Sequence, residues 1–174
     1  MESTRDRFRR LVAPVHERVR AFARGLCRSQ ADGDDLFQEA SLRAFSRLDG
    51  LREDGAFRTW FYRIVISVHR NRARTAFWRR LVPLGERAAE ADYREPAPDA
   101  GDATRRARAA LAVLPTVQRE AIVLFEIDGW KVEEIAALQR VSASAVKSRL
   151  ARGRERLRVY YEKQLGATTP VEST

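Results

Sequence analysis

The chain has 174 residues, 44% of them hydrophobic, and its 33 Lys and Arg against 24 Asp and Glu give a net charge of +9. This length and apolar content suit one ordinary domain or two small ones with a buried core, which excludes wholesale disorder. The excess of positive charge predicts a polyanionic partner, most simply a nucleic acid.

The sequence lacks the features of membrane, secreted and metal-binding proteins. It has no run of 18 apolar residues, and residues 1–10 are mostly charged, so we expect no membrane insertion and a cytoplasmic location. Cys27 is the single cysteine, which excludes an internal disulfide and a multi-cysteine zinc site. His16 and His69 are the two histidines, and they stand at unrelated spacing. We therefore expect no metal and no cofactor.

The first part of the chain has helical periodicity and no strand pattern. Apolar residues recur at steps of three or four from Phe8 to Leu26, and Pro14 interrupts them. A proline inside a helix costs about 3 kcal/mol, so we predict two helices with Pro14 in the first turn of the second. A third helix is expected after an N-cap at Asp34 or Asp35.

That third helix should end near Leu48. The loop "DGLREDGA", residues 49–56, then leads into an aromatic-rich helical stretch that begins at Phe57. By spacing, Phe57 and Trp60 belong to the core, although an aromatic face can also stack on unpaired bases. Both interpretations stay open for these two side chains.

The chain changes character between residues 81 and 103. Three of the six prolines lie here, with six acids against two arginines and no sustained apolar period, which predicts an extended acidic linker. Helical periodicity resumes at Thr104, and residues 166–174 are expected to form a flexible tail. The predicted fold class is therefore all-α, with two small helical domains, 1–80 and 104–165, joined by the linker.

The segment from Glu133 to Arg158 predicts a helix-turn-helix. A short helix with an apolar face is broken by "QRVS", and Ser142 suits the N-cap of the helix that follows. This second helix begins with small residues and continues with cations, a composition that suits the major groove of DNA. Residues 139–163 include eight basic and two acidic residues, which favours DNA binding over an ordinary surface helix. Arg140 stands in the turn where glycine is common.

Two stretches of the sequence resemble a known family. "DGDDLFQEASLRAF", followed by "FRTWFYRI", resembles region 2 of extracytoplasmic-function (ECF) sigma factors, the short sigma subunits of bacterial RNA polymerase. "LAVLPTVQREAIVLFEIDGWKVEEIAALQRVSASAVKSRLARGRERLR" resembles their region 4. The resemblance covers nearly the whole chain in the right order. It implies a non-enzymatic subunit that binds core polymerase, recognises the −35 and −10 promoter elements and helps to open the DNA.

The resemblance also implies roles for particular residues. Those implied to dock on the β′ clamp helices of the polymerase are Asp35, Gln38, Glu39 and Leu42. Those implied at the −10 element are Leu51, Trp60, Ile64, Ser67, Arg70, Asn71 and Arg74. Those implied at the −35 element are Ser144, Lys147, Ser148, Arg149 and Arg152. In the family, the loop that matches residues 50–56 helps to enclose a flipped base, with Leu51, Ile64 and Ser67 in the pocket wall.

Further partners follow from the same resemblance. It implies that Arg119 and Glu120 lie on a helix that faces the polymerase; the alternative is that they form an exposed ion pair. It also implies a contact with the β flap of the polymerase and an anti-sigma protein that covers the same faces. Region 4 has no heptad seam, so no homo-oligomer is expected.

Charge alone predicts phosphate contacts for Arg70, Arg72, Arg74, Arg79 and Arg80. The acidic linker is either a stand-in for RNA in the polymerase cleft or a simple spacer.

Two other classes of protein compete with this interpretation. A conventional regulator with a C-terminal helix-turn-helix would bind an operator without polymerase, but the first 80 residues lack the βα alternation of a receiver domain. A nucleic-acid enzyme such as a recombinase would need a nucleophile and a base. Ser41, Ser46 and Ser67 have no plausible base nearby in sequence, so we expect no catalytic residue.

Overall fold

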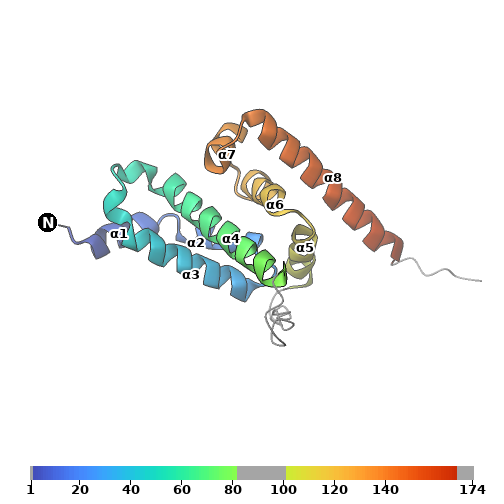
Figure 1. Cartoon of the computed structure of the whole chain (residues 1–174), viewed down its shortest axis with the longest axis horizontal. Helices are drawn as coiled ribbons and strands as arrows, with labels where there is room; N and C mark the ends of the chain where they lie inside the picture. Colours follow the sequence, from blue (N-terminus) through green and yellow to red (C-terminus); the bar gives the residue numbers. More distant parts are fainter. Residues whose placement is uncertain (1, 82–100, 168–174) are drawn as a thin grey trace, which may run out of the picture. The chain divides into compact units, whose positions relative to one another are not determined.

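The computed structural model describes residues 2–81 and 101–167, which form helices and no strand (Figure 1). The predicted all-α class is confirmed. The chain divides into two units, of which the first contains α1 to α4 and the second α5 to α8. In the described ranges, no helix combines the length and the apolar character needed to span a bilayer.

The four helices of the first unit pack around one apolar core. Their bounds are α1 Thr4–Val12, α2 His16–Leu26, α3 Gln30–Ser46 and α4 Phe57–Leu81, with 3-10 turns at Leu48–Gly50 and Asp54–Ala56. Helix α3 packs against both α2 and α4. The largest fully buried side chains of this unit include Phe22, Leu36, Phe61 and Tyr62.

The starts of α2 and α3 differ from the predictions. The break at Pro14 is confirmed, but Pro14 precedes α2, whose N-cap is Val15. The prediction of Asp34 or Asp35 as the N-cap of α3 is wrong, because Ser29 caps the helix by accepting the Asp32 N–H at 3.0 Å. Ser and Asp cap helices about equally well, so the sequence offers several candidates in this stretch.

Gly33 lies inside α3 because α2 passes unusually close to it. A Cβ at this position would stand 2.4 Å from the Arg24 Cα and 2.9 Å from the Arg24 backbone nitrogen. The glycine is unfavourable for an isolated helix by about 1 kcal/mol relative to alanine, and the close helix contact explains its presence.

Asp34, next to Gly33, connects α3 to α2 by ion pairs. Its carboxylate accepts from Arg24 Nε and Nη2, both at 2.8 Å, and from Arg20 Nε at 2.8 Å. The hydrogen-bonded guanidinium of Arg24, with that of Arg20, lowers the pKa of Asp34 from 3.8 to about 2. The residue that the sequence suggested as a cap therefore orients two helices.

The second unit holds the predicted helix-turn-helix. Its bounds are α5 Asp102–Ala112, α6 Thr116–Ile122, a π-helical turn Val123–Ile127, α7 Val132–Gln139 and α8 Ala143–Ala167. After the π-helical turn, Gly129 has a positive φ of 71°, and Trp130 packs inside with 3% of its surface exposed. Helix α8 packs on α6 and α7.

Both predicted domains begin or end slightly differently in the structure. Helix α4 includes Leu81, α5 begins at Asp102 rather than Thr104, and α8 continues to Ala167. The rest of the expected acidic linker, residues 82–100, and the end of the expected tail lie outside the described residues.

We predict that Gly33→Ala destabilises the first unit by about 1–3 kcal/mol, because the new methyl group meets backbone atoms of α2, so that the two helices must shift apart. The midpoint of urea denaturation measures the change. Gly166→Ala is the matched control, since nothing lies within 4 Å of a Cβ there. An unchanged midpoint for Gly33→Ala would disprove the close approach.

We predict that Asp34→Asn lowers stability at pH 7 by about 1–2 kcal/mol. The folded-state pKa is lowered to about 2, so the ion pairs contribute fully above the ordinary value of 3.8 and are lost as pH falls through 2. The difference between wild type and variant should therefore shrink when denaturation is measured at pH 7, 4 and 3. Asp49→Asn, at an exposed site, should show no such trend.

Candidate functional site

One face of α3 presents the residues implied to bind the polymerase. Asp35 and Gln38 are exposed, Glu39 is half-buried, and the Leu42 side chain is 65% exposed. These four positions lie on one side of the helix because they are three or four residues apart. We call them the docking face. A large exposed apolar side chain among acid and amide groups suits a protein partner.

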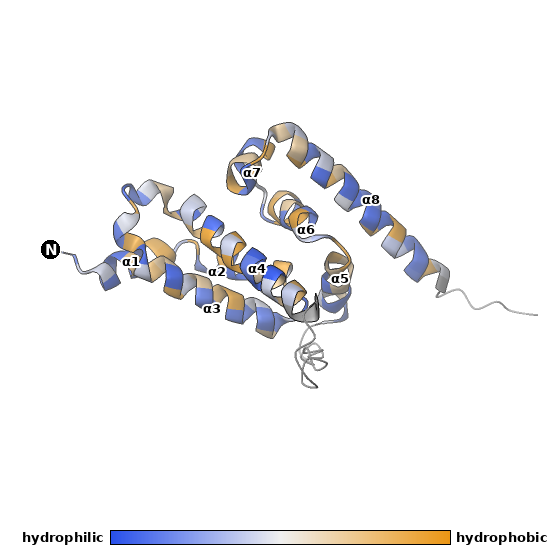
Figure 2. Ribbon diagram, viewed as in Figure 1, coloured by the Kyte–Doolittle hydropathy of each residue, from blue (hydrophilic) through white to orange (hydrophobic). Residues whose placement is uncertain are grey.

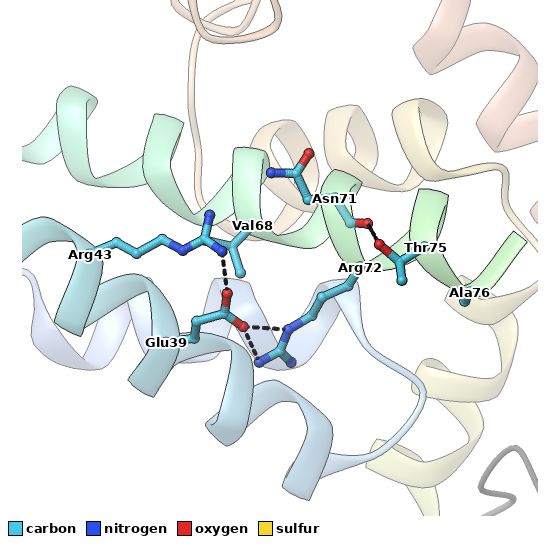
Figure 3. A pocket seen from close by; sticks show the side chains of 7 residues that line it. All are labelled: Glu39, Arg43, Val68, Asn71, Arg72, Thr75 and Ala76. Carbon is cyan, nitrogen blue, oxygen red and sulfur yellow. Dashed lines mark hydrogen bonds and ion pairs between the residues drawn. The ribbon is translucent and has the colours of Figure 1, made fainter. Parts of the chain in front are cut away.

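Within the docking face, Glu39 already has partners inside the first unit. Figure 3 shows its carboxylate between the guanidinium groups of Arg43 and Arg72. Arg43 donates to Oε1 at 2.7 Å, and Arg72 donates to Oε2 through Nη2 at 2.6 Å and Nε at 2.9 Å. Arg72 also donates to the Asp35 carbonyl at 3.2 Å. Arg72, which we expected to contact a DNA phosphate, thus connects α4 to α3 within the chain itself.

A cavity of about 330 Å³ lies beside this ion-pair cluster (Figure 3). Charged and polar groups line it together with Val68 and Ala76, and Thr75 donates to the Asn71 carbonyl there at 2.9 Å. Glu39 stands in its wall between two arginines, so the charge is mixed, which does not favour an anionic ligand.

The residues implied at the −10 element divide between surface and core. Ser67 and Arg74 are exposed on α4, and Arg74 donates to the Asn71 side chain at 3.0 Å. Leu51 and Ile64 are buried, with 7% and 8% of their surface exposed. These two side chains therefore support the surface more than they form it. Arg70 and Asn71 are half-buried.

Phe57 and Trp60 differ in whether they belong to the core or remain accessible to an unpaired base. Phe57 is 2% exposed and belongs to the core. Trp60 is half-buried, and its ring centroid lies 5.8 Å from that of Phe57. Trp60 thus retains some surface that an unpaired base can reach.

The loop before α4 is held by α1, a contact that the sequence did not predict. Arg7 donates to the Leu51 carbonyl at 2.9 Å and to Asp54 Oδ1 at 2.7 Å. Arg10 donates to the other oxygen of Asp54 at 2.8 Å. Hydrogen bonds from Arg10 and Arg7 lower the pKa of Asp54 below its ordinary value. The only sequence signal was two arginines three apart on a helix and an acid in a short loop.

The turn of the helix-turn-helix has the expected form. Arg140 adopts a left-handed conformation with φ 55°, the conformation that glycine accepts most readily. The N–H of Val141 donates to the Ala136 carbonyl at 3.0 Å. Ser142 accepts the Ala145 N–H at 3.1 Å, so its predicted role as the N-cap of α8 is confirmed.

A buried polar chain joins α6, α7 and α8. Gln139, 3% exposed, donates to Glu120 Oε2 and to the Val117 carbonyl, both at 3.0 Å. Arg149 donates to Gln139 Oε1 at 2.8 Å. Arg149, implied at the −35 element, is half-buried and helps to hold the second helix of the motif in place.

Arg119 and Glu120 do not form an exposed ion pair. Glu120 is fully buried, which also removes it from a polymerase-facing surface in this structure. Arg119 donates to the carbonyls of Ala112 at 2.9 Å and Leu114 at 3.0 Å, at the end of α5. The helical spacing of a charged pair gives no sign of such burial, which explains why the alternative of an exposed ion pair is wrong.

The exposed face of α8 carries the other residues implied at the −35 element. Ser144, Lys147, Ser148 and Arg152 are all exposed and lie three or four residues apart. Figure 2 shows that much of α8 is hydrophilic. We call these four residues the recognition face.

On its other side α8 packs closely on α6. Val146 and Leu150 are buried, and a Cβ at Gly153 would lie 2.8 Å from Ile122 Cγ1. Further along, Arg154 pairs with Glu126 at 2.6 Å, and Arg158 pairs with Glu155 and Glu162. Acids therefore neutralise part of the basic run toward the end of the helix, away from the recognition face.

Comparisons with known proteins agree with this division into two units. The family model described as Sigma-70 region 2 matches residues 11–79, and that described as Sigma-70, region 4 matches residues 104–157. The ECF RNA polymerase sigma factor SigM of Mycobacterium tuberculosis is 33% identical over 86% of this chain and 74% of its own length. The ECF RNA polymerase sigma-E factor of Escherichia coli is 34% identical over 71% of each chain.

Two solved structures are also similar. The sigma factor RpoE in complex with the anti-sigma factor NepR from Bartonella quintana has a TM-score of 0.65 and 26% identity over 89% of this chain and 96% of its own. CnrH, solved with the cytosolic domain of CnrY, has the same TM-score and identity over 96% and 92%. Because both sigma-70 regions match in order and curated relatives share a third of the aligned residues, the chain belongs to the ECF sigma factors, the non-catalytic subunits that direct RNA polymerase to specific promoters.

Proposed function

We propose that the docking face binds the β′ clamp helices of core RNA polymerase, while α4 and the recognition face of α8 contact the −10 and −35 elements. The observation that carries this proposal is that exposed and half-buried polar residues lie on α3, α4 and α8, and the opposite sides of these helices are buried in the core of their unit. Each unit is small, so each alone binds weakly. Polymerase combines the two weak affinities by holding both units on one DNA.

At the docking face, apolar contact and charge have separate tasks. Leu42 offers apolar surface that a partner helix can bury. Asp35 and Gln38 are exposed and offer hydrogen-bond acceptors to a basic partner. Glu39 must exchange Arg43 and Arg72 for cations of the partner, so its net contribution is smaller than its charge suggests.

At the −10 element, α4 supplies both stacking and phosphate contacts. The partly exposed ring of Trp60 can stack on an unpaired base, which is worth about 1–3 kcal/mol. Ser67 and Asn71 offer hydrogen-bonding groups on the same side of the helix, and the cations Arg70 and Arg74 follow. The loop of residues 50–56, with Leu51 and Ile64 beneath it, encloses the flipped base.

At the −35 element, the recognition face enters the major groove. Ser144 at the first turn is small enough for close approach, and Lys147, Ser148 and Arg152 can reach base edges and phosphates. Arg149 acts through the fold, because its guanidinium is bonded to Gln139.

An anti-sigma protein is a further proposed partner. The similar sigma factor RpoE was solved in complex with the anti-sigma factor NepR, and CnrH, which is also similar, was solved with the cytosolic domain of CnrY. The exposed Leu42 is the kind of anchor that such a protein would cover.

We place the chain in the cytoplasm, at the nucleoid when it is bound to polymerase, with domains 1–80 and 104–165 and an acidic linker between them.

We predict that Leu42→Glu and Glu39→Lys each abolish co-elution of the chain with bacterial core RNA polymerase. Leu42→Glu leaves the Glu39 ion pairs in place, so it tests the face without disturbing the joint between α3 and α4. Glu17→Lys is the matched charge reversal on an exposed site of the same unit, and it should co-elute normally. Tight operator binding by the chain alone, without co-elution, would instead support a conventional regulator.

We predict that Lys147→Ala weakens binding of the assembled polymerase to its promoter by about tenfold. Lys163→Ala, an exposed lysine far along the same helix, should change it little. Electrophoretic mobility shifts on promoters with native and altered −35 elements give the measurement. Equal loss on both sequences would assign Lys147 to phosphate contact, and no loss on either would contradict the proposed recognition face.

A further inference from the structure

Two arginines of α1, Arg7 and Arg10, bind the loop between α3 and α4. It contains two 3-10 turns of three residues each, Leu48–Gly50 and Asp54–Ala56, joined by residues 51–53. Such turns have poor hydrogen-bond geometry and are weak by themselves. Its own backbone bonds include Leu51 N–H to the Leu48 carbonyl at 2.9 Å. Arg52 and Glu53, at the middle, are exposed.

Arg7 binds this loop at two separate points. Its Nη2 donates to the Leu51 carbonyl at 2.9 Å, after the first turn, and its Nε and Nη2 donate to Asp54 Oδ1 at 3.0 and 2.7 Å, at the start of the second. The planar guanidinium fork reaches both acceptors at once, which a lysine ammonium on its flexible chain does less well. Arg10 binds Asp54 and Glu2 but has no bond to the Leu51 carbonyl.

The helix that carries Arg7 is itself seated on the core. The ring of Phe8 lies 5.5 Å from that of Phe45 and 6.0 Å from that of Phe57, both edge-to-face. Arg7 therefore projects from a fixed helix, and its side chain is only 25% exposed. The region 2 family model begins at residue 11, so Arg7 lies outside it.

We propose that Arg7 is a positioning residue for promoter recognition, which sets the base preference at the −10 element by holding the loop of residues 48–56 in one shape. It acts through the Leu51 carbonyl and the Asp54 carboxylate. The loop ends directly at α4, one turn before Trp60, so its shape determines the space beside the exposed face of that helix. This inference rests on the proposed role of the loop in enclosing a base.

The test uses the full chain assembled with core polymerase and a promoter series that differs at single −10 bases. Open-complex formation on each promoter gives a discrimination ratio. For Arg7→Ala we expect that ratio to fall about tenfold while co-elution with core polymerase stays at the wild-type level. Arg7→Lys should restore part of the ratio, and Arg10→Ala should leave most of it.

Hydrogen exchange separates positioning from general destabilisation. In Arg7→Ala, the amides of residues 51–56 should exchange faster while those within α3 and α4 stay protected as in the wild type. Loss of protection throughout the unit, with all promoters weakened equally, would overturn the inference in favour of a purely structural role. An unchanged discrimination ratio would overturn it as well.

The result for the wild type distinguishes a failure of this inference from a failure of the proposed function. If wild-type chain and polymerase open no promoter, the proposed function fails and the inference falls with it. If the wild type discriminates among −10 bases and Arg7→Ala discriminates equally well, only the role of Arg7 is disproved.

Discussion

Arginine–carboxylate pairs between helices determine the geometry of the first unit. Asp34 connects α3 to α2, Glu39 connects α3 to α4, and Asp54 connects the loop before α4 to α1. Each carboxylate accepts from two arginines. Such charge-assisted forks are directional, so they orient elements that apolar contacts alone would let slide. These three acids are thereby neutralised within the unit, while other cations of this basic chain stay on the surface.

These pairs orient the helices more than they stabilise them. Partly exposed ion pairs contribute about 0–1 kcal/mol each, whereas burial of one large apolar side chain contributes about 1.5–3 kcal/mol. Phe22, Phe61 and Tyr62 are all fully buried in the first unit. Stability thus comes from the core, and the ion pairs select one arrangement of the helices around it. In the second unit, the buried chain through Gln139 does the same for the helix-turn-helix.

The sequence predicted what local signals encode. The helix-turn-helix and the Ser142 cap follow from spacing and from the conformational preferences of single residues. The roles of Asp34, Glu120 and Arg7 did not, because each depends on a residue that is distant in the chain or on burial in the fold. Arg7 and Asp54 are 47 residues apart. An acid in a loop looks the same whether it is solvated or bonded to a helix.

The same limit applies to the candidate site. The sequence predicts which residues lie on the exposed faces, but not the contacts that these residues make within the unit. Glu39 was correctly placed on the surface of α3 that carries Leu42, but its two arginine partners were not foreseen. Those partners change the energetics of the proposed docking. Exchanging one set of arginine bonds for another of similar geometry yields little net free energy. The affinity must then come mainly from burying Leu42 and its apolar surroundings, while the charges ensure that only a basic partner can make the exchange.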